Sequence, residues 1–192
     1  MSGIQSGDAL LKIFKPETSR QWLGLVLLLD QISRNCYRGE ASTSVFRVFD
    51  PLAVDIARIA IKAQGLPEAD PALRWQLAYR QWILMPLMHS EDLAAHEMAL
   101  QHFEKMATDV DELLQGTVKG GDDNAYEQRA ARVFKANEEA VRNQAKMVKV
   151  FEQKHYDIIK KFGRFPHRNA PLGREMTPAE QEFLDNGGDT FA

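Results

Sequence analysis

Apolar residues recur at helical rather than alternating spacing along almost the whole chain of 192 residues. No run rich in Val, Ile and Thr alternates with polar residues, as a strand with one buried face would. A repeat of about 3.6 residues places the apolar side chains of each segment on one face, which must pack against another helix. The spacing therefore predicts an all-α protein.

Helix boundaries are marked by capping residues, prolines and glycines. An N-capping side chain stands directly before a proline at Asp50-Pro51, Asp70-Pro71 and Thr177-Pro178. Proline suits the first helical position because an N–H there would have no helical partner. Thr177 is also followed three residues later by Glu180, which completes a capping box. Gly65 and Gly163 suit the left-handed residue that ends a helix, and Pro86 is expected to end another.

These signals divide the chain into segments. The expected helices cover about 19–34, 51–64, 71–84, 91–114, 125–162 and 178–184. Their lengths and connections favour stacked antiparallel helix pairs in a single domain over residues 1–192. Residues of about 111–150 are expected to form an inserted linker, which includes GTVKGGDDN, and a projecting helix with a thin apolar stripe. Residues 185–192 are expected to be a frayed tail.

The charges of the chain are nearly balanced, with 24 Lys and Arg against 27 Asp and Glu. A general nucleic-acid-binding protein would carry a basic excess, so no nucleic-acid partner is expected. The longest apolar run, Trp22–Leu29, is far shorter than the roughly 18 to 20 residues of a membrane span. Cys36 is the single cysteine, which suits a reducing compartment, and the N-terminal residues lack a secretory pattern. We therefore expect a cytoplasmic protein without a membrane partner.

Asp30 is the first residue whose chemistry needs an explanation, because it follows five apolar residues within a predicted helix. A buried carboxylate without a partner is costly, so Asp30 is expected to be paired or neutral. Arg34 lies one helical turn further on, and Arg38 lies just beyond the predicted helix end. Asp30 and Arg34 could form a structural pair that holds the turn, or they could face a cleft and orient a substrate.

A second polar stretch, MPLMHSEDLAAHE, lies at a predicted helix start. Ser90 is expected to cap this helix, with Glu91 and Asp92 in its first turn. His89 is left over, either as a hydrogen-bonded corner or as an acid–base catalyst. His89, Asp92 and His96 could also share a helical face, but no HExxH signature supports a metal there. No P-loop, GxGxxG, GxSxG or CxxC pattern is present either, so neither a metal nor a cofactor is predicted.

The third stretch, KKFGRFPHRNAPLGR, is basic throughout and contains no acid. Arg164, His167, Arg168 and Asn169 supply donors without local acceptors, and His155 lies on the inner side of the preceding helical turn. Arginine suits planar recognition of a carboxylate or phosphate. The acceptors could therefore be the acids of this chain, namely Asp30, Glu91 and Asp92, or an external anion.

The three polar stretches together resemble the signature blocks of a bacterial and fungal family, domain of unknown function 924. The matching blocks are LLLDQISRNCYRG, LMHSEDLAAHE and HYDIIKKFGRFPHRNAPLGREMTPAEQEFL. The resemblance implies an all-helical fold similar to tetratricopeptide-repeat proteins, with no established activity. By resemblance, the motif positions are Asp30, Gln31, Arg34, Asn35, Arg38, His89, Ser90, Glu91, Asp92, His155, Arg164, Phe165, His167, Arg168, Asn169, Gly173 and Arg174.

The sequence also departs from the family pattern. Ile32-Ser33 stand where an aromatic residue and a proline are usual, and His96 stands where glutamine is usual. Family members normally carry more helical sequence before the first block. The resemblance therefore implies either an open groove on the N-terminal side or a protein partner, such as a second copy of the chain, that covers it.

Two functional hypotheses follow from these residues. In the first, the three blocks converge on an arginine-rich cleft that binds a small or peptidic anionic ligand, or a protein partner. The expected ligand-binding residues are Arg34, Arg38, Arg164, Arg168, Asn169 and His155. In the second, the protein is a cofactor-independent enzyme that acts on a small molecule bearing a carboxylate. His89 or His167 would then be the general acid or base, Asp30 or Glu91 would orient it, and Arg164 and Arg168 would hold the carboxylate.

Overall fold

The computed structural model describes residues 4–117 and 125–191, and this part of the chain contains helices and no strand. The all-α prediction is confirmed. The longer helices are α2 (Ser19–Leu27), α5 (Asp50–Gln64), α7 (Leu77–Met88), α8 (Leu93–Gln115), α9 (Ala125–Ala136), α10 (Glu138–Phe162) and α12 (Pro178–Asp185). Short helices are α1 (Gly7–Leu11), α3 (Ser33–Cys36), α4 (Ser42–Ser44), α6 (Pro71–Arg74) and α11 (Asn169–Leu172). The π-helical segments η1 (Leu28–Ile32) and η3 (Val45–Phe49) and the 3-10 turns η2 (Gly39–Ala41) and η4 (Pro166–Arg168) lie between them.

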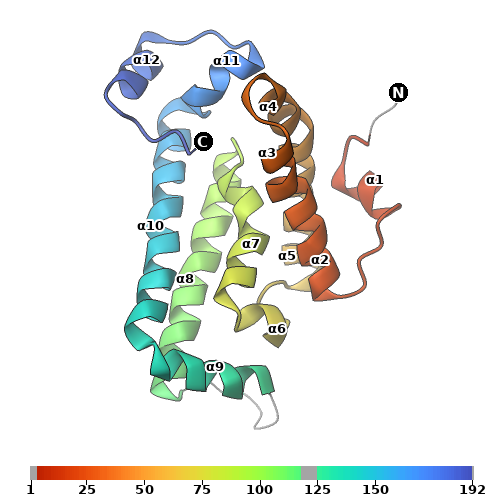
Figure 1. Cartoon of the computed structure of the whole chain (residues 1–192), viewed down its shortest axis with the longest axis vertical. Coiled ribbons are helices and arrows are strands. Elements are labelled where there is room, and N and C mark those ends of the chain that lie inside the picture. The colour runs from red at the N-terminus through yellow and green to blue at the C-terminus, as the bar shows by residue number, and fades with distance from the viewer. Residues whose placement is uncertain (1–3, 118–124, 192) are drawn as a thin grey trace.

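Antiparallel helices form the body of the molecule. Helices α7, α8 and α10 lie side by side, α2 and α5 pack on the other side of α7, and α9 crosses the lower end (Figure 1). The segment from η4 to α12 arches over the upper end. The last turns of α3, α7 and α10 and the first turns of α5 and α8 therefore meet at that upper end. The tetratricopeptide-like arrangement of these helices stays a prediction.

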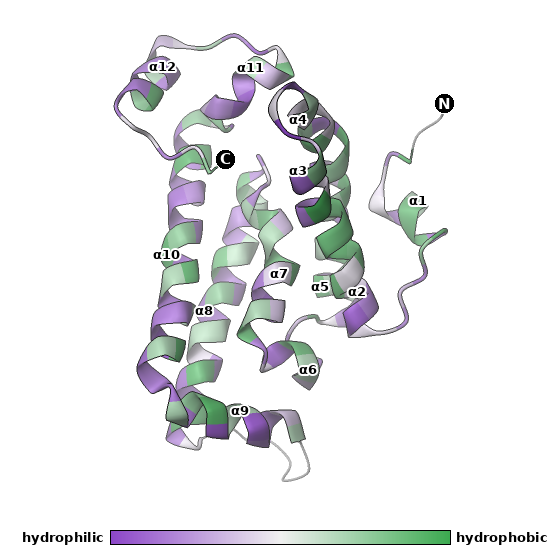
Figure 2. Ribbon diagram, viewed as in Figure 1, coloured by the Kyte–Doolittle hydropathy of each residue, from purple (hydrophilic) through white to green (hydrophobic). Residues whose placement is uncertain are grey.

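Two apolar clusters hold the helices together. Leu84, Phe103 and Met106 are fully buried in the cluster between α7, α8 and α10. Val26 and Ile56 are fully buried in the cluster between α2, α5 and α7. Hydrophobic and hydrophilic bands alternate along α10 in Figure 2, as expected for a helix that packs on one side. Within the described ranges, no helix is long and apolar enough to cross a bilayer.

The helix that was expected to project packs on the body instead. Asn137 divides the predicted helix 125–162 into α9 and α10, and Phe134 of α9 joins the same core cluster as Val148 of α10. Although the apolar stripe is thin, burial of these side chains is sufficient to hold α9 and α10 against the body. Most of the predicted linker GTVKGGDDN lies outside the described residues.

Several boundary predictions are confirmed. Gly65 and Gly163 end α5 and α10 in the left-handed region, with φ of 65° and 69°. Thr177 caps α12 in a capping box with Glu180.

Two other boundary predictions are wrong. Asp50 does not cap α5, because η3 runs into α5 without a break and leaves no free helix start. Pro86 lies inside α7, which continues to Met88. Pro86 has no N–H to donate, so α7 gives up one helical hydrogen bond there and still continues for two more residues.

Candidate functional site

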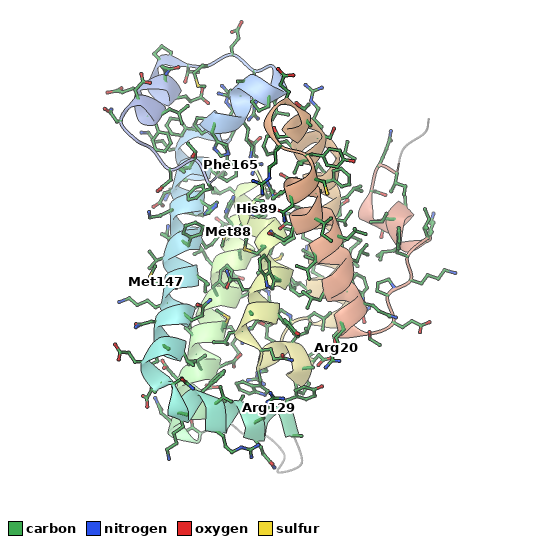
Figure 3. All side chains as sticks on the ribbon, in the orientation of Figure 1. Arg20, Met88, His89, Arg129, Met147 and Phe165 are labelled. Carbon is green, nitrogen blue, oxygen red and sulfur yellow. The ribbon has the colours of Figure 1, made fainter. Side chains whose placement is uncertain are left out.

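Five charged or titratable side chains meet at the upper end of the bundle, and we call them the polar centre. They are Asp30 of η1, Arg34 of α3, Asp50 of α5, His89 just after α7 and Arg168 of η4. Figure 3 shows His89 at this end, below Phe165 and beside α3. Residues from all three polar sequence stretches are therefore close together.

π-Helical turns shape one wall of the polar centre. Asp30 lies in η1 and Phe46 lies in η3, and these two segments contact each other. A π turn contains an extra residue, so it shifts the side chains that follow around the helix axis, and such turns are frequent at functional sites. Within η1, Asp30 is buried together with Leu29.

Asp30 and His89 form a close pair. Nδ1 of His89 lies 2.7 Å from Oδ1 of Asp30, and Asp30 is only 1% exposed. Nε of Arg34 lies 3.5 Å from the same carboxylate oxygen. Burial opposes ionisation of Asp30, but the nearby His89 and Arg34 outweigh burial, so the pKa of this carboxyl lies below its ordinary value. Nε2 of His89 makes no hydrogen bond to the described residues.

Asp50 connects two arginines. Its Oδ1 accepts a hydrogen bond of 2.7 Å from Nη2 of Arg34, and its Oδ2 lies 3.4 Å from Nη1 of Arg168. Burial raises the pKa of Asp50 above its ordinary value despite these two guanidinium groups. Sequence reasoning missed Asp50 as a site residue because the neighbouring proline suggested a helix cap.

Arg168 is the most enclosed arginine of the polar centre, at 5% exposure. Its Nη1 also donates to the backbone oxygen of His89 at 3.0 Å. Its guanidinium lies 4.7 Å from the ring centre of Phe46 and 4.4 Å from that of Phe165. Burial lowers the pKa of Arg168 to about 10, so it stays charged at neutral pH.

Other predicted site residues lie beside the polar centre in internal pairs. Glu91 accepts two hydrogen bonds from Arg174, at 2.7 and 3.0 Å, and one from the backbone N–H of Phe165 at 2.8 Å. Arg164 donates to both oxygens of Glu180 at 2.6 and 2.8 Å, which leaves it turned towards α12 rather than towards the polar centre.

The corner before α8 differs from the predicted cap. Asp92 caps the helix by accepting from the N–H of Ala94 at 3.0 Å, and it also pairs with Arg58. Ser90 instead accepts from the N–H of Asp92 at 3.1 Å. The cap moves because α8 begins only at Leu93.

His155 and His167 lie near the polar centre without a hydrogen bond to an acidic side chain among the described residues, and Asn169 lies beside Glu180. His155 donates from Nδ1 to the backbone oxygen of Phe151 at 2.8 Å, and burial lowers its pKa to about 3. Burial and the nearby Arg168 lower the pKa of His167 to about 4. Both imidazoles are therefore neutral at pH 7. The side-chain nitrogen of Asn169 faces the sulfur of Met176 at 3.4 Å.

Two hollows adjoin the polar centre. The larger, which we call the arginine hollow, has a volume of about 470 Å³, and its walls include Arg34, Arg38, Arg168, His167, Phe46 and Phe191. The smaller, of about 310 Å³, is lined in part by His89, Asp50, Glu91 and Arg168. Arg168 and Phe46 line both hollows. In the described part of the chain, no cluster of three or more His, Cys, Asp or Glu could hold a metal ion.

Comparison with known families gives a match over almost the whole chain. The model described as "Bacterial protein of unknown function (DUF924)" matches residues 7–188. The chain belongs to this family. The resemblance of the three polar stretches to DUF924 is thereby confirmed.

A solved structure is also similar to this DUF924 chain. It is a protein of unknown function from Agrobacterium tumefaciens, with 32% sequence identity and a TM-score of 0.57. The similarity covers 89% of this chain and 70% of that one. No curated protein matches the chain.

His96 and Glu152 of this DUF924 protein form a fully buried pair that sequence reasoning missed. Nδ1 of His96 lies 2.8 Å from Oε1 of Glu152, and its Nε2 lies 2.8 Å from the backbone oxygen of Ser90. His96 was instead considered as part of a metal half-site. Glu152 precedes His155 by three residues, so its helical spacing could have indicated that both face inward.

Proposed function

We propose that this DUF924 protein binds a small anionic molecule, or the acidic end of a peptide, in the arginine hollow. The observation that carries the proposal is that Arg34, Arg38 and Arg168 line one hollow, whereas none of the described residues in its walls is acidic. Arg34 and Arg38 come from the first polar stretch and Arg168 from the third. Guanidinium groups bind carboxylates and phosphates through paired hydrogen bonds, so these anions are the expected ligand groups.

The charge balance of the polar centre supports an external anion. Two carboxylates, Asp30 and Asp50, reach Arg34 and Arg168, and Asp30 is shared with His89. Arg38 donates to the side-chain oxygen of Asn35 at 2.9 Å and pairs with no carboxylate among the described residues. Arg38 is also exposed, so it is free to turn towards a ligand.

Of the six residues predicted to bind the ligand, Arg34, Arg38 and Arg168 are retained in the proposal. Arg164 is held by Glu180, and Asn169 and His155 are not part of the walls of the arginine hollow. A thermal-shift screen of phosphates, mono- and dicarboxylates and short acidic peptides tests the proposal. We expect stabilisation by one of these classes in the unmodified protein and a clear loss of it in Arg38→Gln. Silence across the whole screen would contradict the proposal.

The second candidate function is acid–base catalysis by His89, and the short Asp30–His89 contact favours it. Asp30 can accept a hydrogen bond from Nδ1–H, which leaves Nε2 as the basic nitrogen, the arrangement of a histidine oriented by a carboxylate. His89 lines the smaller hollow, next to Arg168. His167 lacks an orienting carboxylate, and Glu91 is engaged by Arg174 and Phe165, so they are weaker candidates.

Proton exchange tests this second function without knowledge of the product. A general base that removes a proton from carbon would exchange that proton for deuterium in D₂O, which proton NMR detects. We expect exchange in small carboxylates with the unmodified protein and none with His89→Gln. Because His89 does not line the arginine hollow, the variant should still bind anions. Equal exchange rates in the two proteins would contradict the role of His89.

The exposed Cys36 is compatible with the proposed cytoplasmic location, where it would stay reduced. A protein partner or second copy over the N-terminal side stays a prediction.

A further inference from the structure

An aromatic slot lies beside the arginine hollow and is filled by Phe191. Its walls are His155, Phe151 and Phe165. The ring of Phe191 stacks on His155 with 3.5 Å between ring centres and 16° between ring planes. It meets Phe151 and Phe165 edge-on, at 5.3 and 6.4 Å. Three aromatic walls therefore surround a single flat ring.

Phe191 lies at the end of the segment that follows α12, and the path of this segment places its ring in the slot. Helix α12 ends at Asp185, and Gly187 then reverses the chain with a φ of 76°. Figure 1 shows the segment returning from α12 to the upper part of α10, where the chain ends. Asp189 lies 3.2 Å from Lys154, and both side chains are about half exposed. Exposed ion pairs contribute little, so aromatic packing is the main hold on this segment.

Phe191 also lines the arginine hollow. The ring of Phe165 connects the two regions, because Arg168 lies 4.4 Å from the centre of that ring and Phe191 packs on it too. A molecule whose anionic group contacts Arg34, Arg38 and Arg168 would thus have Phe191 beside it. A flat aromatic group attached to the anion would reach the slot only in place of that ring.

We propose that the aromatic slot is a second part of the anion site and that the preferred ligand is an anion bearing an aromatic ring. Phe191 is then an internal occupant of the slot, which competes with the aromatic ring of the ligand. This inference rests on the proposed anion binding. The stacked geometry of Phe191 on His155 indicates the shape that the slot accepts, namely a flat ring rather than an aliphatic chain. An occupant attached to the same chain competes at high effective concentration, so the slot is filled in the absence of ligand.

Titration calorimetry with three probes tests the inference on the full chain. The probes are 3-phenylpropionate, hexanoate as an aliphatic acid of comparable reach, and inorganic phosphate. In Phe191→Ala, 3-phenylpropionate should bind at least fivefold more tightly than in the unmodified protein, whereas phosphate and hexanoate should change by less than twofold. Phe191→Tyr should behave like the unmodified protein because tyrosine can fill the slot. Tyr79→Ala, which removes an exposed aromatic side chain of α7, is the matched control and should leave the affinity for all three probes unchanged.

The possible outcomes separate this inference from the proposed function. In one outcome, phosphate binds through the arginines, but Phe191→Ala does not raise the affinity for 3-phenylpropionate, or raises the affinity for hexanoate equally. The aromatic slot is then not a subsite, and the proposed anion site is unaffected. If no probe binds any of the proteins, this inference fails, and the proposed function fails as well only when the thermal-shift screen is also silent. Should Phe191→Ala not fold, Phe191→Leu keeps an apolar group there, and a gain of about twofold or more for 3-phenylpropionate alone supports the inference while its absence overturns it.

Discussion

Nδ1 of His89 lies 2.7 Å from Oδ1 of Asp30, and this contact joins the end of α7 to the π turn of η1. The two residues are 59 positions apart in the sequence. Their contact brings the first two polar stretches together, and Arg168 adds the third by donating to the backbone oxygen of His89. The polar centre is therefore also a junction on which the upper end of the bundle depends.

Asp30→Asn should lower the free energy of unfolding at pH 7 by about 1–3 kcal/mol, because His89 and Arg34 lose a charged acceptor. The pKa of Asp30 in the folded protein lies below its ordinary value of 3.8. Ionised Asp30 thus stabilises the fold above pH 3.8, and this contribution is lost as pH falls through the lowered pKa. Urea unfolding at pH 7 and near pH 3 should show that the two proteins differ less in acid. A difference that grows in acid would contradict the pairing.

For the His96–Glu152 pair we predict the opposite pH dependence of stability. The backbone oxygen of Ser90 can only accept, so Nε2 of His96 carries a proton, and a second proton must lie between Nδ1 and Oε1. Burial raises the pKa of Glu152 above its ordinary value of 4.5. The contribution that the raised pKa of Glu152 makes to stability is complete below pH 4.5 and is lost as pH rises through that pKa.

Glu152→Gln should therefore cost less than about 1 kcal/mol, because the amide can donate to Nδ1 in place of the proton. Glu152→Leu should cost about 1–3 kcal/mol, since it leaves a ring nitrogen of His96 without a partner. Urea unfolding between pH 4.5 and 8 measures both effects. Only the unmodified protein should lose stability through the titration of residue 152. An equal pH dependence in Glu152→Gln would show that this pair holds no extra proton.

Arg168→Ala and Arg38→Gln should differ sharply in stability. Arg168 is buried against Phe46 and Phe165 and contacts Asp50. Its replacement by alanine should lower the free energy of unfolding by about 2–4 kcal/mol. The loss is somewhat smaller than for a buried carboxylate left without any partner, because Asp50 still pairs with Arg34. Arg38 is exposed, and its replacement should stay within about 0.5 kcal/mol. Thermal and urea unfolding of both variants checks this. A large loss in Arg38→Gln would make that residue structural and remove it from the ligand site.

Local signals in the sequence were sufficient for the helical fold. Thr177 with Glu180, and Gly65 and Gly163, mark helix ends through short-range hydrogen bonds and backbone conformation, which do not depend on distant residues. At Asp50, the local signal predicts the wrong role for the side chain. The residue before a proline has the chemistry of a cap, but tertiary contacts with Arg34 and Arg168 use its carboxylate instead.

The composition of the candidate site could be predicted only in part. Asp30 was expected to need a partner because a buried carboxylate is costly, and the structure supplies His89 and Arg34. That Arg164 faces Glu180 depends on how the segment after α10 folds back, which spacing along a helix does not determine. The position of Phe191 depends on the same reversal, so a residue of the predicted frayed tail lies against His155.

Calorimetric titration of inorganic phosphate and succinate into the unmodified protein, Arg38→Gln and Arg129→Gln tests the central claim most directly. Arg129 is an exposed arginine of α9 at the opposite end of the molecule (Figure 3), so its variant controls for the general loss of one positive charge. We expect one of the anions to bind the unmodified protein and Arg129→Gln equally. It should bind Arg38→Gln about tenfold more weakly, which corresponds to one charge-assisted hydrogen bond of about 1.4 kcal/mol. Absence of binding to the unmodified protein, or equal affinity in all three, would contradict an anion site in the arginine hollow.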